Sequence, residues 1–229
     1  MKLSKQTLEF LANLNNINKS IHIKAAETTE NFTKIRTKST DGNLYGEVDI
    51  PEIFTKDACF FELNKFIQCV KSMGGEEAEI EFKDNFANVK NGKNSVKLVY
   101  TDPSYIITPD FSRKRSVHPA VLEFSLTQDD MKKLLDNAKI LQLPHIQILS
   151  SNGKIIIRAI DERLPSSNTY EIELKDGDLD EKYVIKTELL TILQGDYTFK
   201  ITENYVDLMN TSFTDANLMY RMLLEENGE

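Results

Sequence analysis

The chain contains an internal repeat, and the spacing of this repeat limits the folds that it can adopt. Ser4 and Thr127 each precede an amphipathic segment, and they are separated by 127 − 4 = 123 positions. Two similar segments that begin at Asp57 and Asp180 have the same offset, 180 − 57 = 123. One offset at two independent places predicts two similar halves.

Four helix starts are predicted, at Ser4, Asn64, Thr127 and Thr187. Serine, threonine and asparagine side chains can each accept a hydrogen bond from a free backbone N–H at a helix start. Apolar residues after Thr127 recur at intervals of three and four, which indicates one buried helix face. These residues are Met131, Leu134, Leu135 and Ala138.

Short runs of alternating apolar and polar residues follow each predicted helix, and turn signals separate them. The dipeptides Asn91-Gly92 and Asn152-Gly153 are typical of β-hairpin turns. Each quarter of the chain is therefore predicted to be a β-α-β-β-β unit, and the fold class is α+β with duplicated units.

The units pair into two similar domains, predicted at residues 1–102 and 121–229. Residues 103–120 are predicted to form the connector between them. Pro103, Pro109 and Pro119 interrupt regular structure in and around this segment, because proline lacks the backbone N–H that helices and sheets use.

Chemistry-bearing residues do not form a recognisable catalytic or metal-binding pattern. The adjacent acids Asp129 and Asp130 lie at a predicted helix start, where the helix dipole favours negative charge, so we interpret them as helix-start acids. His22, His118 and His145 lack the spacing of a ligand set. We predict no enzyme activity, no metal and no cofactor, although a catalytic site assembled without short motifs stays an open alternative.

Composition favours a soluble intracellular protein. The chain has 28 basic and 36 acidic residues, a net charge of −8, and only two cysteines. It has no apolar run long enough to span a membrane. An acidic chain is a poor candidate for tight, charge-driven binding to DNA, because phosphate neutralisation needs surplus lysine and arginine.

This organisation, together with the opening "MKLSK", the acidic charge and the length, resembles the DNA sliding clamps, and more narrowly the polymerase clamps of T-even-type bacteriophages. The resemblance implies a homotrimeric ring with helices inside and sheets outside. Such a ring encircles duplex DNA without reading its sequence and tethers the replicative DNA polymerase. A clamp-loader ATPase opens it, it also serves late transcription, and it acts in the cytoplasm of the infected bacterial cell.

Two sets of residues are expected to carry this function. Lysines on or beside the predicted helices would face DNA: Lys2, Lys5, Lys65, Lys71, Lys132, Lys133 and Lys139. Two strands at sheet edges would join neighbouring subunits through Val96, Leu98 and Tyr100 on one and Tyr170, Ile172 and Leu174 on the other.

Partners of clamps typically insert an apolar C-terminal peptide beside the connector. The residues expected to receive it are Tyr105, Ile106, Ile107 and Phe111, with Met222 and Leu223. An equally open alternative is that these side chains only cover a domain junction. The basic run Arg113–Arg115 is interpreted as a solvated linker charge or as a contact for DNA or an acidic partner. A competing functional hypothesis is a non-encircling scaffold that binds peptides.

Overall fold

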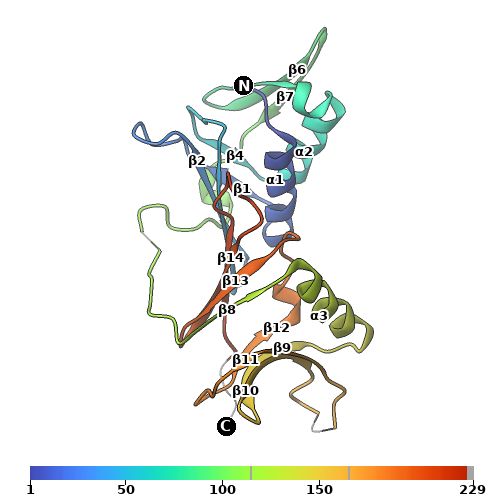
Figure 1. The fold of residues 1–229 in the computed structure, drawn as a ribbon. Coiled ribbons are helices and arrows are strands. Elements are labelled where there is room, and N and C mark those ends of the chain that lie inside the picture. Colours follow the sequence, from blue (N-terminus) through green and yellow to red (C-terminus); the bar gives the residue numbers. More distant parts are fainter. Residues whose placement is uncertain (114, 165, 226–229) are drawn as a thin grey trace. The chain divides into compact units, whose positions relative to one another are not determined.

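The computed structural model describes residues 1–113, 115–164 and 166–225. The chain divides into two compact units (Figure 1). Unit 1 comprises Met1–Arg115 with Phe213–Met219, and unit 2 comprises Ser116–Ser212 with Tyr220–Glu229. The return of Phe213–Met219 to unit 1 has a packing reason, since the ring of Phe213 lies edge-on against Phe10, with centroids 5.1 Å apart.

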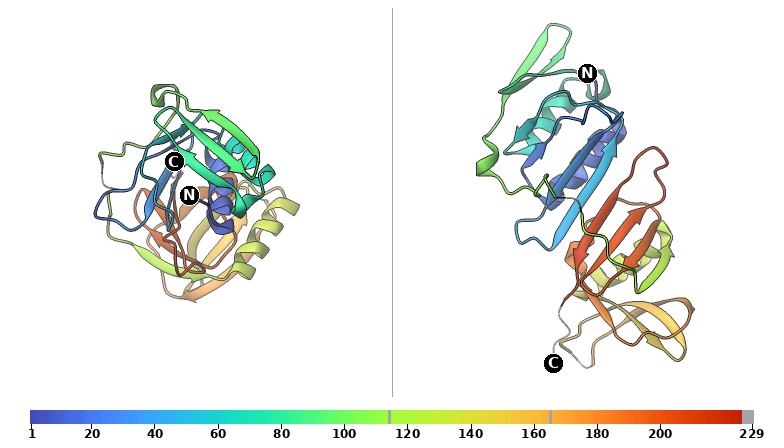
Figure 2. Two further views of the ribbon diagram at one scale, coloured as in Figure 1. Left: turned by 90° about the horizontal axis from the view of Figure 1, so that it is seen from above. Right: turned by 90° about the vertical axis from the view of Figure 1, so that its left-hand side faces the viewer.

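Unit 1 combines two helices with three groups of strands. Its elements are α1 Lys5–Ile17, β1 Ile21–Ile23, β2 Thr33–Lys38, β3 Leu44–Ile50, β4 Ala58–Phe60, α2 Leu63–Ser72, the 3-10 helix η1 Gly75–Glu77, β5 Glu79–Phe82, β6 Phe86–Asn91, β7 Asn94–Val99 and the 3-10 helix η2 Pro103–Tyr105. Strand β1 pairs with β4, β2 pairs with β3, and β5, β6 and β7 form one antiparallel sheet. Helices α1 and α2 lie side by side (Figures 1 and 2).

Unit 2 contains one α-helix and two groups of four strands. Its elements are β8 Leu122–Leu126, α3 Gln128–Ile140, β9 His145–Ser151, β10 Lys154–Ile160, β11 Tyr170–Asp176, β12 Tyr183–Lys186, the 3-10 helix η3 Thr187–Leu189, β13 Tyr197–Ile201, β14 Tyr205–Asn210 and β15 Met219–Leu223. The strand orders are β11-β10-β9-β12 and β8-β13-β14-β15. The connector region between β7 and β8 contains only the short η2 as regular structure among its described residues.

The predicted repeat is confirmed most clearly by α1 and α3. Both helices have 13 residues, and their first residues, Lys5 and Gln128, differ by 123. The hydroxyl of Ser4 accepts from the N–H of Thr7, and that of Thr127 accepts from the N–H of Asp130, each at 3.1 Å. Equivalent sequence signals therefore produce equivalent capped helices.

Both predicted hairpin turns are also confirmed. Asn91 pairs with Asn94 across the first turn, and Gly92 has φ +56°, the positive value that a type II′ turn needs at its first loop residue. The second turn consists of Asn152 and Gly153, with φ +51° and +73°, as in a type I′ turn.

The predicted cap at Asn64 is wrong, because α2 begins at Leu63 and its N-cap residue is Glu62, without a side-chain cap. The N–H of Leu63 instead donates to the carbonyl of Lys19 at 2.8 Å. Asn64 lies inside the helix, where its Oδ1 accepts from Gln68 at 3.4 Å. A backbone contact from a distant segment thus fixes this helix start.

The predicted helix after Thr187 is also wrong, since only the single 3-10 turn η3 forms there. The Thr187 hydroxyl donates to the carbonyl of Leu143 at 2.9 Å and does not cap a helix. The N–H of Leu190 bonds to the carbonyl of Thr187, the three-residue spacing of a 3-10 turn. The described residues therefore contain three α-helices, one fewer than expected.

Thr127 caps a helix and Asn64 does not, and substitutions at the two positions test this difference. Thr127→Ala is expected to lower the free energy of unfolding by about 1 kcal/mol, because it removes the acceptor for the Asp130 N–H. Asn64→Ala, the matched control, is expected to change it by less than about 0.5 kcal/mol, since alanine is a good helix former. Urea unfolding followed by circular dichroism measures both, and equal losses would contradict the assignment.

Candidate nucleic-acid interface and sheet edges

The lysines at the start of unit 1 are held by acidic residues. Lys2 forms an ion pair with Glu77 at 2.8 Å, and this hydrogen bond raises the pKa of the lysine. Lys5, the first residue of α1, lies 4.0 Å from Glu9 one turn later. Both lysines are exposed, but each already has a carboxylate beside it.

The lysines of α2 and α3 fall into two classes. Lys65 is ion-paired with Glu62, and Lys132 with Asp136 at 2.8 Å, a contact that raises the pKa of Lys132. By contrast, three exposed lysines form no ion pair with any described residue. These are Lys71, Lys133 and Lys139. Their charges are therefore the ones available to an external anion.

Strands β7 and β11 each lie at the edge of a sheet. Side chains along both strands alternate between half-buried and exposed. The half-buried residues are those predicted at the subunit interface: Val96, Leu98, Tyr100, Tyr170, Ile172 and Leu174. Val99, on the opposite face of β7, is 70% exposed. Both strands thus present unpaired backbone groups beside apolar side chains.

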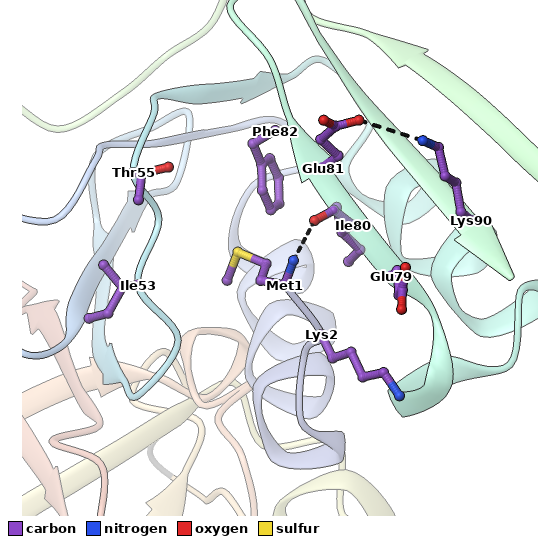
Figure 3. A pocket seen from close by; sticks show the side chains of 9 residues that line it. All are labelled: Met1, Lys2, Ile53, Thr55, Glu79, Ile80, Glu81, Phe82 and Lys90. Carbon is purple, nitrogen blue, oxygen red and sulfur yellow. Dashed lines mark hydrogen bonds and ion pairs between the residues drawn. The ribbon is translucent and has the colours of Figure 1, made fainter.

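The opposite edges of these two sheets are partly covered by other parts of the chain. Met1 exchanges two backbone hydrogen bonds with Ile80 of β5, at 2.8 and 2.7 Å (Figure 3). In the other sheet, the N–H of Glu225 donates to the carbonyl of Val184 of β12 at 2.9 Å. In these two sheets other parts of the chain therefore cover β5 and β12, whereas the outer edges of β7 and β11 are open in the described part of the structure.

An open cavity of about 660 Å³ lies beside the covered strand β5 (Figure 3). Its lining includes Lys2, Glu81 and Lys90. Glu81 lies 3.6 Å from Lys90, and Lys2 contacts Glu77. Glu79 also lines the cavity, and its carboxylate is exposed beside these paired charges.

The connector residues predicted to bind partners are anchored on unit 1. The side chain of Asn18 donates to the carbonyl of Ile107 at 3.1 Å. The ring of Phe111 lies edge-on against His22, with centroids 5.5 Å apart, and Lys24 lies 6.0 Å from its centre. Tyr105 and Ile107 remain 75% and 44% exposed. The segment is held by its backbone and Phe111 while other apolar groups face solvent.

The other proposed pocket residues belong to unit 2. Met222 is fully buried and packs in the core, so it is not available as a surface contact. Its predicted role in an exposed pocket is therefore corrected. Leu223 is 44% exposed and lines an open cavity of about 330 Å³ with Glu203 and Asn204. Alternation along β15 explains why adjacent residues have opposite environments.

The basic run Arg113–Arg115 is only partly described. Arg113 pairs with Asp110 at 3.1 Å, whereas residue 114 lies outside the described residues. Burial raises the pKa of Glu47, but a hydrogen bond from Tyr45 and the nearby positive charges, including Arg115, together hold it below its usual value. Arg113 thus has an acidic partner, whereas Arg115 acts on Glu47 through its charge and has one buried guanidinium nitrogen without a hydrogen-bond partner among the described residues.

Sequence and structure comparisons identify what this arrangement resembles. No family model matches. The chain is 27% identical over 203 residues to the "Sliding clamp" of Enterobacteria phage T4, covering 86% of this chain and 85% of that protein. It is also 27% identical over 234 residues to the "Sliding clamp" of Escherichia phage RB69, covering 100% and 98%.

Solved structures with a similar fold were also found. PCNA of A. fulgidus, bound to the C-terminal region of FEN-1, matches with a TM-score of 0.71 and 16% identity over 97% of this chain and 96% of that one. The chain has the sliding-clamp fold. The PCNA2–PCNA3 complex of Sulfolobus tokodaii gives a TM-score of 0.68 and 12% identity, with coverages of 96% and 95%.

The structure also shows contacts by residues that the sequence did not single out. Met1 and Glu225 cover strand edges. Three acids, Glu62, Glu77 and Asp136, form ion pairs with lysines whose ammonium groups would otherwise be free to bind an anion. The spacing of Lys132 and Asp136, one helical turn apart, was a sequence signal for that pair. The Lys2–Glu77 and Met1–Ile80 contacts join segments more than 70 residues apart, and no local pattern marks them.

The described part of the chain contains no cluster of three or more His, Cys, Asp or Glu residues that could hold a metal ion. Burial raises the pKa of the Cys59 thiol to about 11, which disfavours the reactive thiolate. None of the described helices has both the length and the apolar character needed to cross a membrane.

His22 gives the connector contact a testable pH dependence. Burial lowers the pKa of His22, and the Lys24 charge acts in the same direction, against the hydrogen bond and charge of Asp57. The unfolded chain therefore binds the proton more readily, so stability is lost as pH falls below about 6.5.

Relative to a His22→Gln variant, the parent is expected to lose free energy of unfolding between pH 7 and pH 5. One proton limits the slope to about 1.4 kcal/mol per pH unit. Denaturant unfolding at several pH values measures the difference. Parallel pH profiles for parent and variant would show that His22 is not the group responsible.

Proposed function

We propose that this protein is a DNA sliding clamp, a ring of three identical subunits that encloses duplex DNA and holds the replicative polymerase on it. The observation that carries the proposal is the clamp fold over nearly the whole chain, at a TM-score of 0.71. The curated relatives from phages T4 and RB69 are named as sliding clamps, which supports the same role here. The proposed function is retention on DNA and requires no catalysis.

Ring closure is proposed to occur through the two open strands, β7 of one subunit and β11 of the next. The two surfaces differ, so the contact is heterologous, and such contacts close into a ring when the rotation between subunits permits it. Each strand supplies three half-buried apolar side chains and a row of free backbone groups. The PCNA2–PCNA3 complex of Sulfolobus tokodaii indicates that chains of this fold associate with one another.

The helices are proposed to face the DNA. With 36 acidic and 28 basic residues, the protein repels phosphate overall, and a protein that slides needs weak contacts. Lys71, Lys133 and Lys139 would provide these contacts, because their ammonium groups lack an acidic neighbour among the described residues. Topological enclosure, instead of tight binding, would then keep the ring on DNA.

The exposed connector side chains are proposed to receive an apolar peptide from the polymerase and other partners. Tyr105 and Ile107 offer apolar surface on a segment that Asn18 holds in place. The A. fulgidus PCNA structure contains the C-terminal region of a partner, which supports peptide docking on this fold. A clamp-loader ATPase and late-transcription factors of the infected bacterial cell are proposed as further partners.

Topological binding is directly testable. A loader-assisted reaction on nicked circular DNA is expected to leave the clamp on the circle after gel filtration in moderate salt. Linearising the DNA should then release it, because the ring slides off the ends. Retention on linear DNA would indicate ordinary binding, and a stable monomer unable to stay on the circle would favour a non-encircling scaffold.

The two classes of lysine give a matched comparison. Replacing Lys71, Lys133 and Lys139 by glutamine is expected to lower the loading rate at low salt by about tenfold, since three phosphate contacts are lost. Replacing Lys2, Lys65 and Lys132 changes the net charge equally but removes ammonium groups already held by acids. Loading kinetics across a salt series measure both, and equal losses would contradict a local DNA contact.

A further inference from the structure

We propose that neighbouring copies pair β7 with β11 in one register, in which Lys97 of one copy lies directly opposite Glu173 of the next. This inference rests on the proposed ring and specifies how its subunits recognise one another. It starts from β7 and β11, the outer strands opposite β5 and β12, which Met1 and Glu225 cover.

The hydrogen-bonding direction of β7 selects which residues can bond to a partner strand. The N–H of Tyr100 donates inward to the carbonyl of Asn85 at 3.0 Å. Backbone groups alternate in direction along a strand. The N–H and carbonyl groups of Ser95, Lys97 and Val99 therefore point to the open edge.

The same argument selects residues on β11. Ser151 and Lys154 pair across a two-residue turn. The backbone groups of Lys154, and of every second residue after it (Ile156 and Arg158), therefore bond to β9. The backbone groups of Ile157, which lies between two such residues, consequently point to β11, where Ile157 pairs with Ile172. The backbone groups of Glu171 and Glu173 on either side of Ile172 point to the open edge.

An antiparallel contact must place these outward-facing residues opposite one another. Lys97 can therefore lie opposite Glu171 or Glu173. Beyond Leu174 the alternation reverses, so the backbone groups of Lys175 face Ile155 of β10 and not the open edge. A slip that brought Lys97 close to Lys175 would also oppose two like charges, which is unfavourable. The ammonium of Lys175 also donates to the carbonyl of Glu123 at 2.9 Å within its own unit.

The apolar side chains distinguish the remaining two registers. With Lys97 opposite Glu173, Leu98 lies opposite Ile172 and Tyr100 opposite Tyr170, so apolar and aromatic groups meet. With Lys97 opposite Glu171, Tyr100 would instead lie opposite Asn168. Cross-strand apolar and aromatic pairs stabilise a sheet, so the first register is favoured.

Existing ion pairs favour the same register. Glu171 is 3.6 Å from Arg158, and its side chain is 46% exposed. Glu173 is 74% exposed, and its nearest cation, Lys154, is 3.9 Å away and closer to Asp176, at 2.9 Å. Lys97 forms no ion pair with a described residue, and its ammonium lies 4.3 Å from the centre of the Phe86 ring. Glu173 and Lys97 are thus the freest opposite charges on the two edges.

An irregularity in β11 provides a natural end to the contact. The pairing of β10 with β11 shifts between Ile155 and Ile156, which leaves Leu174 as the extra residue. A bulge bends a strand and interrupts its pairing. The Lys97–Glu173 pair is therefore the last regular pair before the strand bends, and slippage past it would move Lys97 toward Lys175.

Charge reversal tests the register in the full-length protein. Lys97→Glu and Glu173→Lys are each expected to raise the concentration needed for half-assembly by about tenfold, because attraction becomes repulsion. The double variant should recover at least most of the loss. Sedimentation velocity over a range of concentrations measures assembly, and the differences should shrink at about 1 M salt, where exposed charges are screened.

Two controls make the outcome specific. Lys93→Glu changes the same charge in the β6–β7 turn and should leave assembly unchanged. Lys97→Glu combined with Glu171→Lys should not recover assembly, and recovery by this pair in place of the Glu173 pair would overturn the proposed register. If the parent protein is monomeric at every concentration, the proposed ring fails instead.

Disulfide cross-linking tests the same register without relying on charge. Leu98 and Ile172 would form a non-hydrogen-bonded pair, whose Cα atoms approach to about 4.5 Å, within disulfide range. In a Cys69→Ser background, Leu98→Cys with Ile172→Cys should give covalent dimers and trimers on mild oxidation. Leu98→Cys with Tyr170→Cys should cross-link less, and the reverse preference would overturn the proposal.

Discussion

Burial of the apolar faces of α1 and α3 is the interaction on which each unit depends. Leu8 and Leu11 of α1 and Met131 and Leu134 of α3 are buried, at the same positions of the repeat. One buried stripe fixes the rotation of a helix and leaves its polar side outward. On α3, Lys133 and Lys139, which are proposed to meet DNA, are thereby exposed as a consequence of core packing.

The second constraint is the finite width of the sheets. A sheet that does not close on itself has two outer strands with unpaired backbone groups, and these are sites for association. In the β5-β6-β7 sheet Met1 bonds to the outer strand β5, and in the β11-β10-β9-β12 sheet Glu225 bonds to the outer strand β12. The remaining strands, β7 and β11, carry complementary charge and matching half-buried faces, so a single geometric feature links the fold to the proposed ring.

Charge is organised more finely than the net value of −8 indicates. Some helix lysines are neutralised by nearby acids, as Lys132 is by Asp136, whereas Lys71 and Lys133 have no such partner among the described residues. In the proposed function, these few free cations on an acidic protein would provide weak, mobile contact with phosphate. This arrangement suits a protein whose retention would depend on enclosure.

The sequence by itself determined the features that local chemistry controls: the repeat, the capped helices after Ser4 and Thr127, the hairpin turns and the alternating edge strands. It misplaced the start of α2 and predicted a helix after Thr187, because in each case a distant carbonyl, that of Lys19 or Leu143, takes the hydrogen bond. Which edges stay open was also decided only by the tertiary structure. The physical reason is that these outcomes depend on groups far apart in the chain, which no short pattern of residues can report.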